Sequence, residues 1–350
     1  VTDNVGGTIL GNVTVNGVTS ITSTDGDITQ AEGTRVLFGN EVTLKAGKSD
    51  NSTIYDIVLD NDGNDLGTVT NAAGKNVTLV DDLNGLKVGW IKGTGDLEIT
   101  SNDGAITQGE EDGDGIEVAG KTKVKASKTI NGVEQAENIA LNGSNNDFQG
   151  TVSADGKEVS LVDKNDLKLD QIKTTGKFNA KAVKDLTQTS TSVIEVADEA
   201  TLESTSGNVT LDGDNNTFNG TVNVNAQAGD TVLAGKQGIA LGLLKTKNAT
   251  ITAEDDISQV AGSEVVVTEN TDVTSTNGSV DLSGDNNDFQ GAVSADGLDV
   301  SLADTNDLLL DQVKAEGNFD AKAEYDITQA SDSEVVVTEN TDVTSTNGSV

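Results

Sequence analysis

Short runs in which apolar and polar residues alternate occur along the whole chain. Clear examples are VTLV at 77–80, VSLV at 159–162 and VSLA at 300–303. Strict alternation over four to eight residues is typical of β-strands with one buried face. Gly, Asn and Asp separate the runs, and these residues tolerate the left-handed backbone of tight turns. The pattern predicts an ordered all-β protein built from short strands.

The same sequence phrases return along the chain at regular intervals. Residues 263–280 and 333–350 are identical. The motif [DA]-[IL]-[TS]-Q occurs at 27–30, 105–108, 185–188, 256–259 and 326–329. A second motif, rich in Asn and Asp, occurs as NDLG at 64–67, NNDFQG at 145–150, NNTFNG at 215–220 and NNDFQG at 286–291. These phrases predict one continuous array over 1–350, with approximate repeat units 1–67, 68–150, 151–220, 221–291 and 292–350.

Each repeat unit divides further into shorter periods. Strands with matching patterns lie at Val273, Val300, Asp320 and Val343, at steps of 27, 20 and 23 residues. We therefore predict three coils per unit, each a turn of a parallel β-helix, or β-solenoid. Roughly 15 rungs, stacked at the ~4.8 Å strand spacing, would form an elongated rod. Strand twist favours a right-handed solenoid.

Composition narrows the function classes. The chain has no Cys, His, Met or Pro, and its net charge is −36. Proline would interrupt a ladder of backbone hydrogen bonds, so its absence fits a solenoid. The negative charge disfavours nucleic acid as a partner. No run of 18 apolar residues occurs, so we expect no membrane insertion as a helix. The opening VTDNVGG lacks the basic and apolar regions of a signal peptide, which suggests a section of a longer protein.

One long stretch carries a family resemblance. The run NNDFQGTVSADG, followed by VSLVDKNDLKLDQIKTTGKFNAKAVKDLTQ, covers 145–188. It resembles the repeat region of filamentous-haemagglutinin-like adhesins, the exoproteins of two-partner secretion, and the resemblance extends from about Val18 to Val350. It implies a right-handed parallel β-helix on a bacterial outer-membrane surface, exported through an outer-membrane transporter. The Asn-Pro motifs of that family's secretion domain are missing here, and its repeats have no catalytic residues to transfer.

The Asn/Asp-rich loops are the best candidates for a metal site. They are GSNNDF at 143–148, GDNNTF at 213–218 and GDNNDF at 284–289. Calcium is bound by six to eight oxygen atoms, and Asp147, Asp214, Asp285 and Asp288 could supply some of them. The other interpretation is a turn closed by Asn or Asp, with the Phe beneath it covering the core. We favour the turn, because the first two loops have one carboxylate each, so no cofactor is expected apart from calcium as the weaker alternative.

Catalytic residues are scarce. Without His or Cys, the common triads and dyads cannot form. Paired carboxylates could hydrolyse sugars, but such sites need a unique set of acids and aromatic platforms. Here the acids recur with the repeat, so we expect no enzyme. The single tryptophan, Trp90, aligns with Gln171, Leu243 and Gln312 in the other units. It could contact a partner, but we favour a packing role in a groove between strands.

These observations predict the structural shaft of a large secreted bacterial adhesin. The shaft would present a distal region to a host-cell or surface receptor, in cell adhesion or biofilm formation. One alternative is a self-associating extracellular matrix or filament protein, which would form fibres. Another is the delivery stick of a contact-dependent toxin. Concentration-dependent sizing separates the shaft from the fibre.

Overall fold

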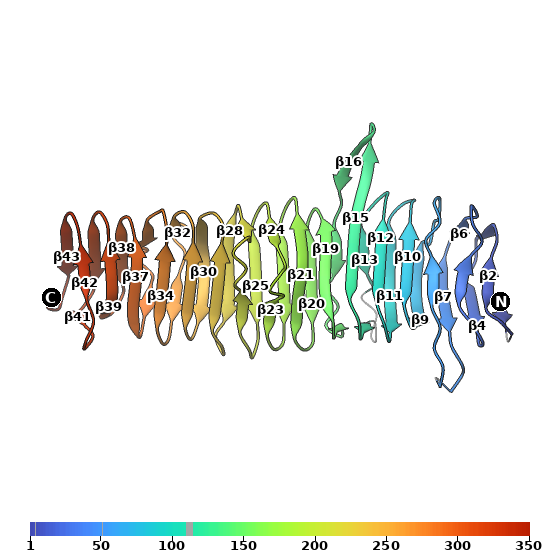
Figure 1. The fold of residues 1–350 in the computed structure, drawn as a ribbon, viewed down its shortest axis with the longest axis horizontal. Coiled ribbons are helices and arrows are strands. Elements are labelled where there is room, and N and C mark those ends of the chain that lie inside the picture. The colour runs from blue at the N-terminus through green and yellow to red at the C-terminus, as the bar shows by residue number, and fades with distance from the viewer. Residues whose placement is uncertain (4, 51, 110–114) are drawn as a thin grey trace. The chain divides into compact units, whose positions relative to one another are not determined.

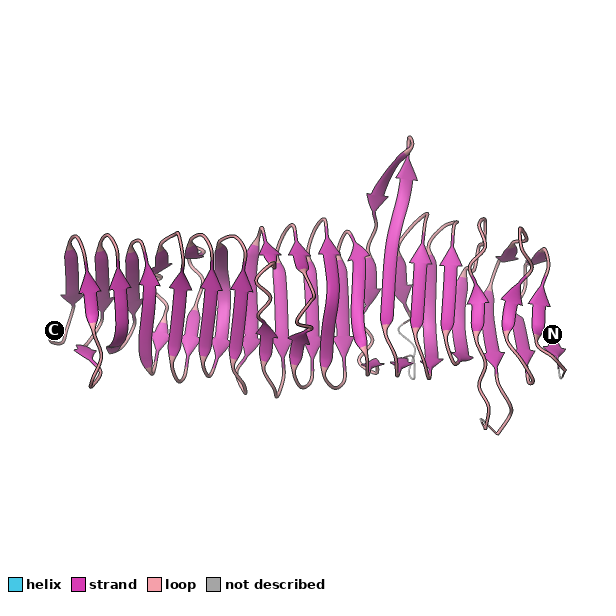
Figure 2. Cartoon of the chain, in the orientation of Figure 1, coloured by secondary structure: helices cyan, strands magenta, loops and turns pink. Residues whose placement is uncertain are grey.

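The computed structural model describes residues 1–3, 5–50, 52–109 and 115–350. Strands alternate with turns throughout these residues, and none of them lies in a helix (Figure 2). Accordingly, no described segment forms a helix that could cross a membrane. The chain divides into two units, Val1–Lys177 and Phe178–Val350. In each unit parallel strands stack coil upon coil, so the predicted parallel β-solenoid is confirmed (Figure 1).

The first unit has two long sheets, named here 1A and 1B. Sheet 1A contains β1 (Thr2–Asp3), β4 (Thr19–Ser23), β7 (Glu41–Ala46), β9 (Thr68–Gly74), β11 (Leu86–Gly93), β13 (Ile106–Gln108), β14 (Ile116–Val118), β17 (Ile139–Leu141), β18 (Asp147–Phe148) and β20 (Val159–Asp163). Sheet 1B contains β2 (Thr8–Leu10), β5 (Ile28–Gln30), β8 (Ile57–Leu59), β10 (Val77–Asp81), β12 (Leu97–Ser101), β15 (Thr122–Ile130), β19 (Thr151–Gly156) and β21 (Leu167–Thr174). A short third sheet pairs β3 (Val13–Val15) with β6 (Val36–Phe38).

The second unit repeats this arrangement in sheets 2A and 2B. Sheet 2A contains β22 (Phe178–Ala182), β25 (Ala200–Ser204), β28 (Thr221–Ala226), β30 (Ile239–Thr246), β32 (Ile257–Gln259), β33 (Val265–Val267), β35 (Val280–Leu282), β36 (Asp288–Phe289), β38 (Val300–Asp304), β40 (Phe319–Ala323) and β43 (Thr341–Ser345). Sheet 2B contains β23 (Leu186–Gln188), β24 (Ile194–Val196), β26 (Val209–Leu211), β27 (Thr217–Phe218), β29 (Thr231–Gly235), β31 (Ala249–Ala253), β34 (Thr271–Ser275), β37 (Ala292–Gly297), β39 (Leu308–Ala315), β41 (Ile327–Gln329) and β42 (Val335–Val337).

The interior consists of columns of apolar side chains, one residue per coil. In sheet 2B, Leu233 pairs with Ile251, which pairs with Val273, and all three side chains are buried. On each strand the residues that flank these three point outward, and most of them are polar, as the alternation predicts. Burial of each column is the main stabilising contribution, since apolar surface contributes about 25 cal/mol per Å² removed from water.

The coils are shorter than predicted, and the repeat contains three and a half of them. In the second unit Leu186 pairs with Val209, 23 residues on, whereas Val293 pairs with Leu310, 17 residues on. The prediction of three coils per repeat is wrong, because the step from Val273 to Val300 runs from sheet 2B to sheet 2A. A repeat of 70 residues passes alternately through sheets 2A and 2B, seven times in all. Because seven is odd, the next repeat starts on the opposite sheet.

Successive repeats therefore present the same sequence on opposite sheets. The identical segments 263–280 and 333–350 illustrate this, because Thr271–Ser275 forms β34 in sheet 2B and Thr341–Ser345 forms β43 in sheet 2A. The motif at 185–188, 256–259 and 326–329 also changes sheet each time, as β23, β32 and β41. Within a unit, like surfaces recur on one sheet only at every second repeat.

Two features of the first unit stand out from its coils (Figure 1). Strand β15 continues past its coil and pairs with β16 (Val133–Ala136) as an antiparallel hairpin. Its turn is formed by Asn131 and Gly132, with φ values of 54° and 77°, as a two-residue hairpin turn requires. The second feature is the excursion between β7 and β8, which is closed where Gly47 pairs with Ile54.

Candidate functional site

A pair of amide side chains, in which the Asn is always buried, recurs beside each Asn/Asp-rich loop. It joins the Gln of the first motif to an Asn of the second motif, which lies in the next coil. The described pairs are Gln30–Asn64, Gln108–Asn146, Gln188–Asn216 and Gln259–Asn287. In the Gln188–Asn216 pair, Gln188 Nε2 donates to Asn216 Oδ1 at 3.2 Å and Asn216 Nδ2 donates back to Gln188 Oε1 at 2.7 Å.

The amide pair fills the interior where a strand of the ladder is broken in two. Asn216 Oδ1 also accepts the Ile194 N–H at 3.0 Å, and its Nδ2 donates to the Leu211 carbonyl at 3.3 Å. The Asn side chain thus satisfies one backbone group at the break between β23 and β24 and one at the break between β26 and β27. Buried polar groups left without partners cost about 1–3 kcal/mol each, so this pairing permits the break.

A buried carboxylate accompanies the amide pair at three of these strand breaks, and we call the pair and the carboxylate together a joint. Asp163 accepts the Phe148 N–H at 2.6 Å and the Asn165 N–H at 2.5 Å. Asp304 does the same for Phe289 and Asn306, at 2.9 and 2.6 Å. Asp81 accepts the N–H groups of Leu66 and Leu83 at 2.6 and 3.1 Å. The remaining copy has Gly235 at this position and so lacks the carboxylate.

Burial perturbs these three carboxylates. Desolvation raises the pKa of Asp81 to about 7, and it raises the pKa values of Asp163 and Asp304 to about 6. The accepted backbone N–H groups favour the ionised form and oppose this shift in each pKa.

The predicted calcium residues lie on the outer side of these joints. Asp147 forms an ion pair with Lys164 at 3.3 Å, and Asp288 accepts hydrogen bonds from Asn306 and Gln290 at 3.1 and 3.0 Å. Asp214 is exposed, and its side chain has no partner among the described residues. The Phe residues beneath the loops are buried, at 148, 218 and 289. The carboxylates thus belong to separate turns, each closed over a Phe.

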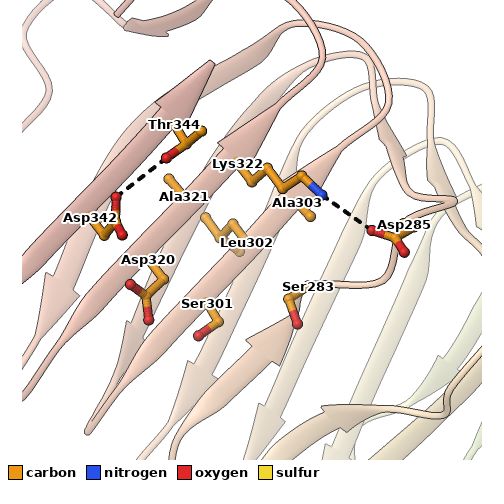
Figure 3. Close-up of a pocket in the computed structure, with 10 residues that line it drawn as sticks. All are labelled: Ser283, Asp285, Ser301, Leu302, Ala303, Asp320, Ala321, Lys322, Asp342 and Thr344. Atoms are coloured by element: carbon orange, nitrogen blue, oxygen red, sulfur yellow. Dashed lines mark hydrogen bonds and ion pairs between the residues drawn. The ribbon is translucent and has the colours of Figure 1, made fainter. Parts of the chain in front are cut away.

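Asp285 lies at the edge of a groove across sheet 2A (Figure 3). Its side chain is 87% exposed and faces Lys322 Nζ at 3.5 Å. Asp320 and Asp342 occupy neighbouring strands at paired positions, and Asp342 accepts a hydrogen bond from Thr344 at 3.3 Å. Across the described ranges, no three Asp or Glu side chains gather in a group that could hold a metal ion.

The pKa shifts predict a fold that is more stable in mild acid. Because the folded pKa values of Asp81, Asp163 and Asp304 exceed the ordinary 3.8, the folded chain binds these protons more tightly than the unfolded chain. The cost of holding each carboxylate ionised is complete above its folded pKa and is relieved as pH falls through 7 and 6. From pH 8 to pH 5 we expect about 1 kcal/mol or more of added stability per carboxylate.

Denaturant unfolding at both pH values measures this gain. Asp163→Asn should reduce the difference between pH 8 and pH 5, whereas Asp214→Asn, at an exposed carboxylate, should leave it unchanged. An equal pH dependence in both variants would show that general charge repulsion, and not the buried carboxylate, causes the effect.

Comparison with known proteins places the chain in one family. Its sequence model matches 1–73, 74–155, 156–225, 228–296 and 297–350, so the chain belongs to the family described as repeats of unknown function (DUF5649). No curated protein and no solved structure matches the chain. The chain is therefore a repeat protein with a β-solenoid fold.

Proposed function

We propose that this chain is the structural shaft of a large secreted bacterial surface adhesin of the filamentous-haemagglutinin-like type. The observation that supports this best is the ladder that continues from coil to coil within each unit, over buried apolar columns. Such a stack gains length by adding coils and needs no cleft or cofactor. The shaft holds a distal binding region of the longer protein away from the cell.

The buried polar chemistry supports the same role. The Gln–Asn pairs and the buried Asp residues satisfy backbone groups of adjoining coils, and their hydrogen bonds are made within the solenoid. They stabilise broken strands and are closed to substrates, so we infer no catalytic activity. The net charge of −36 keeps a long solenoid soluble and discourages lateral association.

The coil-by-coil arrangement of the strands also suits export. We infer secretion through an outer-membrane transporter, with coils forming in order as the chain emerges on the cell surface. Each new coil finds a finished edge on which to pair, which makes folding sequential. We infer no need for calcium in this role, since Asp147 and Asp288 already have partners within the protein.

Adherence of the isolated 350-residue chain to cells and matrix, with and without calcium, tests the proposal alongside light scattering. We expect a monomer that confers no adherence under either condition. Adherence would show that this stretch is itself the binding region.

Self-association is the second candidate. The observation that favours it is the tip of the β15–β16 hairpin, where Ile130 and Val133 are 40% and 61% exposed. Growth of the scattering mass with concentration would support a fibre, and its loss in Ile130→Ser/Val133→Ser would assign that growth to the hairpin.

A further inference from the structure

A groove on the outer side of sheet 1A differs from the rest of this acidic chain. It has a volume of about 500 Å³ and crosses β7, β9 and β11. Its principal lining residues are Lys45, Ile54, Asn71, Ala73, Trp90 and Lys92. Trp90, the one tryptophan of the chain, is half-buried there. None of the described residues that line the groove has a carboxylate.

The ladder fixes the order of these side chains. Trp90 pairs with Asn71, while Lys92 pairs with Ala73, which pairs with Lys45. The small side chain of Ala73 thus separates two lysines on neighbouring strands. Ile54, from the excursion between β7 and β8, adds an apolar side chain where it pairs with Gly47.

Several polar groups in the groove are available to bind a ligand. The Trp90 indole N–H, the Asn71 amide and the Lys45 ammonium have no hydrogen-bond or ion-pair partner among the described residues. Lys92 Nζ does have a partner, Glu117, at 3.1 Å. The groove therefore offers an aromatic face, a free amide and a free cation, which are features of ligand recognition.

The last repeat supplies a matched groove of opposite character. It lies at the equivalent ladder position in sheet 2B, on β34, β37 and β39, with a volume of about 380 Å³. Gln312 and Lys314 stand where Trp90 and Lys92 stand, because β39 and β11 pair with their neighbours at the same positions. Thr274 replaces Lys45 and Asp296 replaces Ala73. Three acids line this second groove, Asp272, Asp296 and Glu334.

The two grooves share one backbone arrangement but differ in charge: the first has two lysines and no acid in its lining, whereas the second has three acids and one lysine. Of the two, only the first has the indole. A solenoid position that serves packing alone accepts Gln, as at 171 and 312, or Leu, as at 243. The combination at Trp90 suits a ligand with a flat apolar face and a negative charge. One ring with one carboxylate matches one indole, the free Lys45 ammonium and the Lys92 ammonium, which is shared with Glu117.

We propose that this groove binds a uronic-acid polysaccharide, with a sugar ring stacked on Trp90 and its carboxylate held by Lys45 and Lys92. The C–H face of a pyranose contacts the indole, the Asn71 amide hydrogen-bonds to hydroxyls, and the ammonium groups attract the carboxylate. The −36 charge of the surrounding chain opposes any polyanion, a polyuronate as well as nucleic acid, so recognition depends on the indole and the lysines of the groove. The site goes beyond the shaft role and does not depend on it.

Titration of the whole chain with oligogalacturonate, followed by tryptophan fluorescence, tests the proposal. The signal comes from the site itself, because Trp90 is the single tryptophan. We expect a saturable change in emission that weakens with added salt. Fully methyl-esterified oligogalacturonate keeps the rings and removes the charge, so it should bind about tenfold more weakly or worse.

Variants taken from the matched groove keep the fold while changing the chemistry. Lys45→Thr/Ala73→Asp reproduces Thr274 and Asp296 and should abolish the fluorescence change, with unfolding unaltered. Trp90→Gln reproduces Gln312 and should lose binding by calorimetry. No response to the acid oligomer, equal binding of the ester, equal binding of oligothymidylate, or unchanged affinity in the double variant would each overturn the proposal. These outcomes leave the shaft proposal untouched, because that is tested by adherence and sizing.

Discussion

Ile251→Asp is expected to destabilise its coils by about 5 kcal/mol, whereas Thr252→Asp, one residue further on, should change stability by less than about 0.5 kcal/mol. Ile251 is buried in the column between Leu233 and Val273. Thr252 is exposed on the same strand, β31, and its ladder neighbours are Ala234 and Thr274. The two variants introduce the same carboxyl group on opposite sides of one strand.

The size of the effect follows from the interior. A carboxyl group among Leu and Val side chains stays neutral at pH 7 only if its pKa rises by about 3 units, which costs ~4 kcal/mol. Loss of the Ile side chain from the column costs about 1–2 kcal/mol more. Denaturant unfolding and limited proteolysis measure the difference, with new cleavage expected near 251 in the first variant alone. Equal stability of the two variants would contradict the assignment of inward and outward faces.

The same pair of variants tests whether coil formation assists export. If folding on the cell surface pulls the chain outward, Ile251→Asp should lower the secreted yield and Thr252→Asp should not. Unchanged yield from both variants would separate secretion from folding.

The alternating pattern was sufficient to predict the fold class, because inward positions must be apolar in a narrow interior. It could not predict the number of coils per repeat. A strand in sheet 2A and a strand in sheet 2B have the same inward columns and outward polar residues, so nothing in the letters of Thr271–Ser275 and Thr341–Ser345 identifies the sheet. Only the count of crossings, seven per repeat, shows that like surfaces alternate.

The buried carboxylates could have been found from the same alternation. In β10 the inward positions are Val77, Leu79 and then Asp81, so Asp81 continues the inward series. The alignment of Trp90 with Gln171, Leu243 and Gln312 was available from the sequence, and each is the fifth residue of an eight-residue strand.

The sequence alone could not predict that Lys45 and Lys92 lie beside Trp90. Lys45 and Lys92 lie on either side of Ala73 because β9 pairs with both β7 and β11 in this register. The insertion that forms the β15–β16 hairpin was likewise hidden within a repeat unit of uneven length.

Asn216→Ala is expected to destabilise the second unit by about 3 kcal/mol or more, whereas Asn215→Ala should have almost no effect. Asn216 is buried and makes two hydrogen bonds with Gln188, one with the Ile194 N–H and one with the Leu211 carbonyl. Asn215 is exposed in the same loop. The substitutions are chemically identical and adjacent, so they differ only in the contacts removed.

The loss exceeds that of an ordinary hydrogen bond because partners remain buried. After Asn216→Ala, the Ile194 N–H loses its side-chain acceptor, and the Gln188 amide keeps only its hydrogen bonds with Ser192 and Gly213. Buried groups that lose partners keep a desolvation cost of about 1–3 kcal/mol each. Adding Gln188→Leu should restore part of the stability, since it removes one stranded amide and leaves an apolar side chain. Hydrogen exchange of the Ile194 amide measures the effect locally and should accelerate by about two orders of magnitude, because 1.4 kcal/mol corresponds to about tenfold. An unchanged exchange rate at Ile194 in Asn216→Ala would show that the amide pair is not what closes the break between β23 and β24.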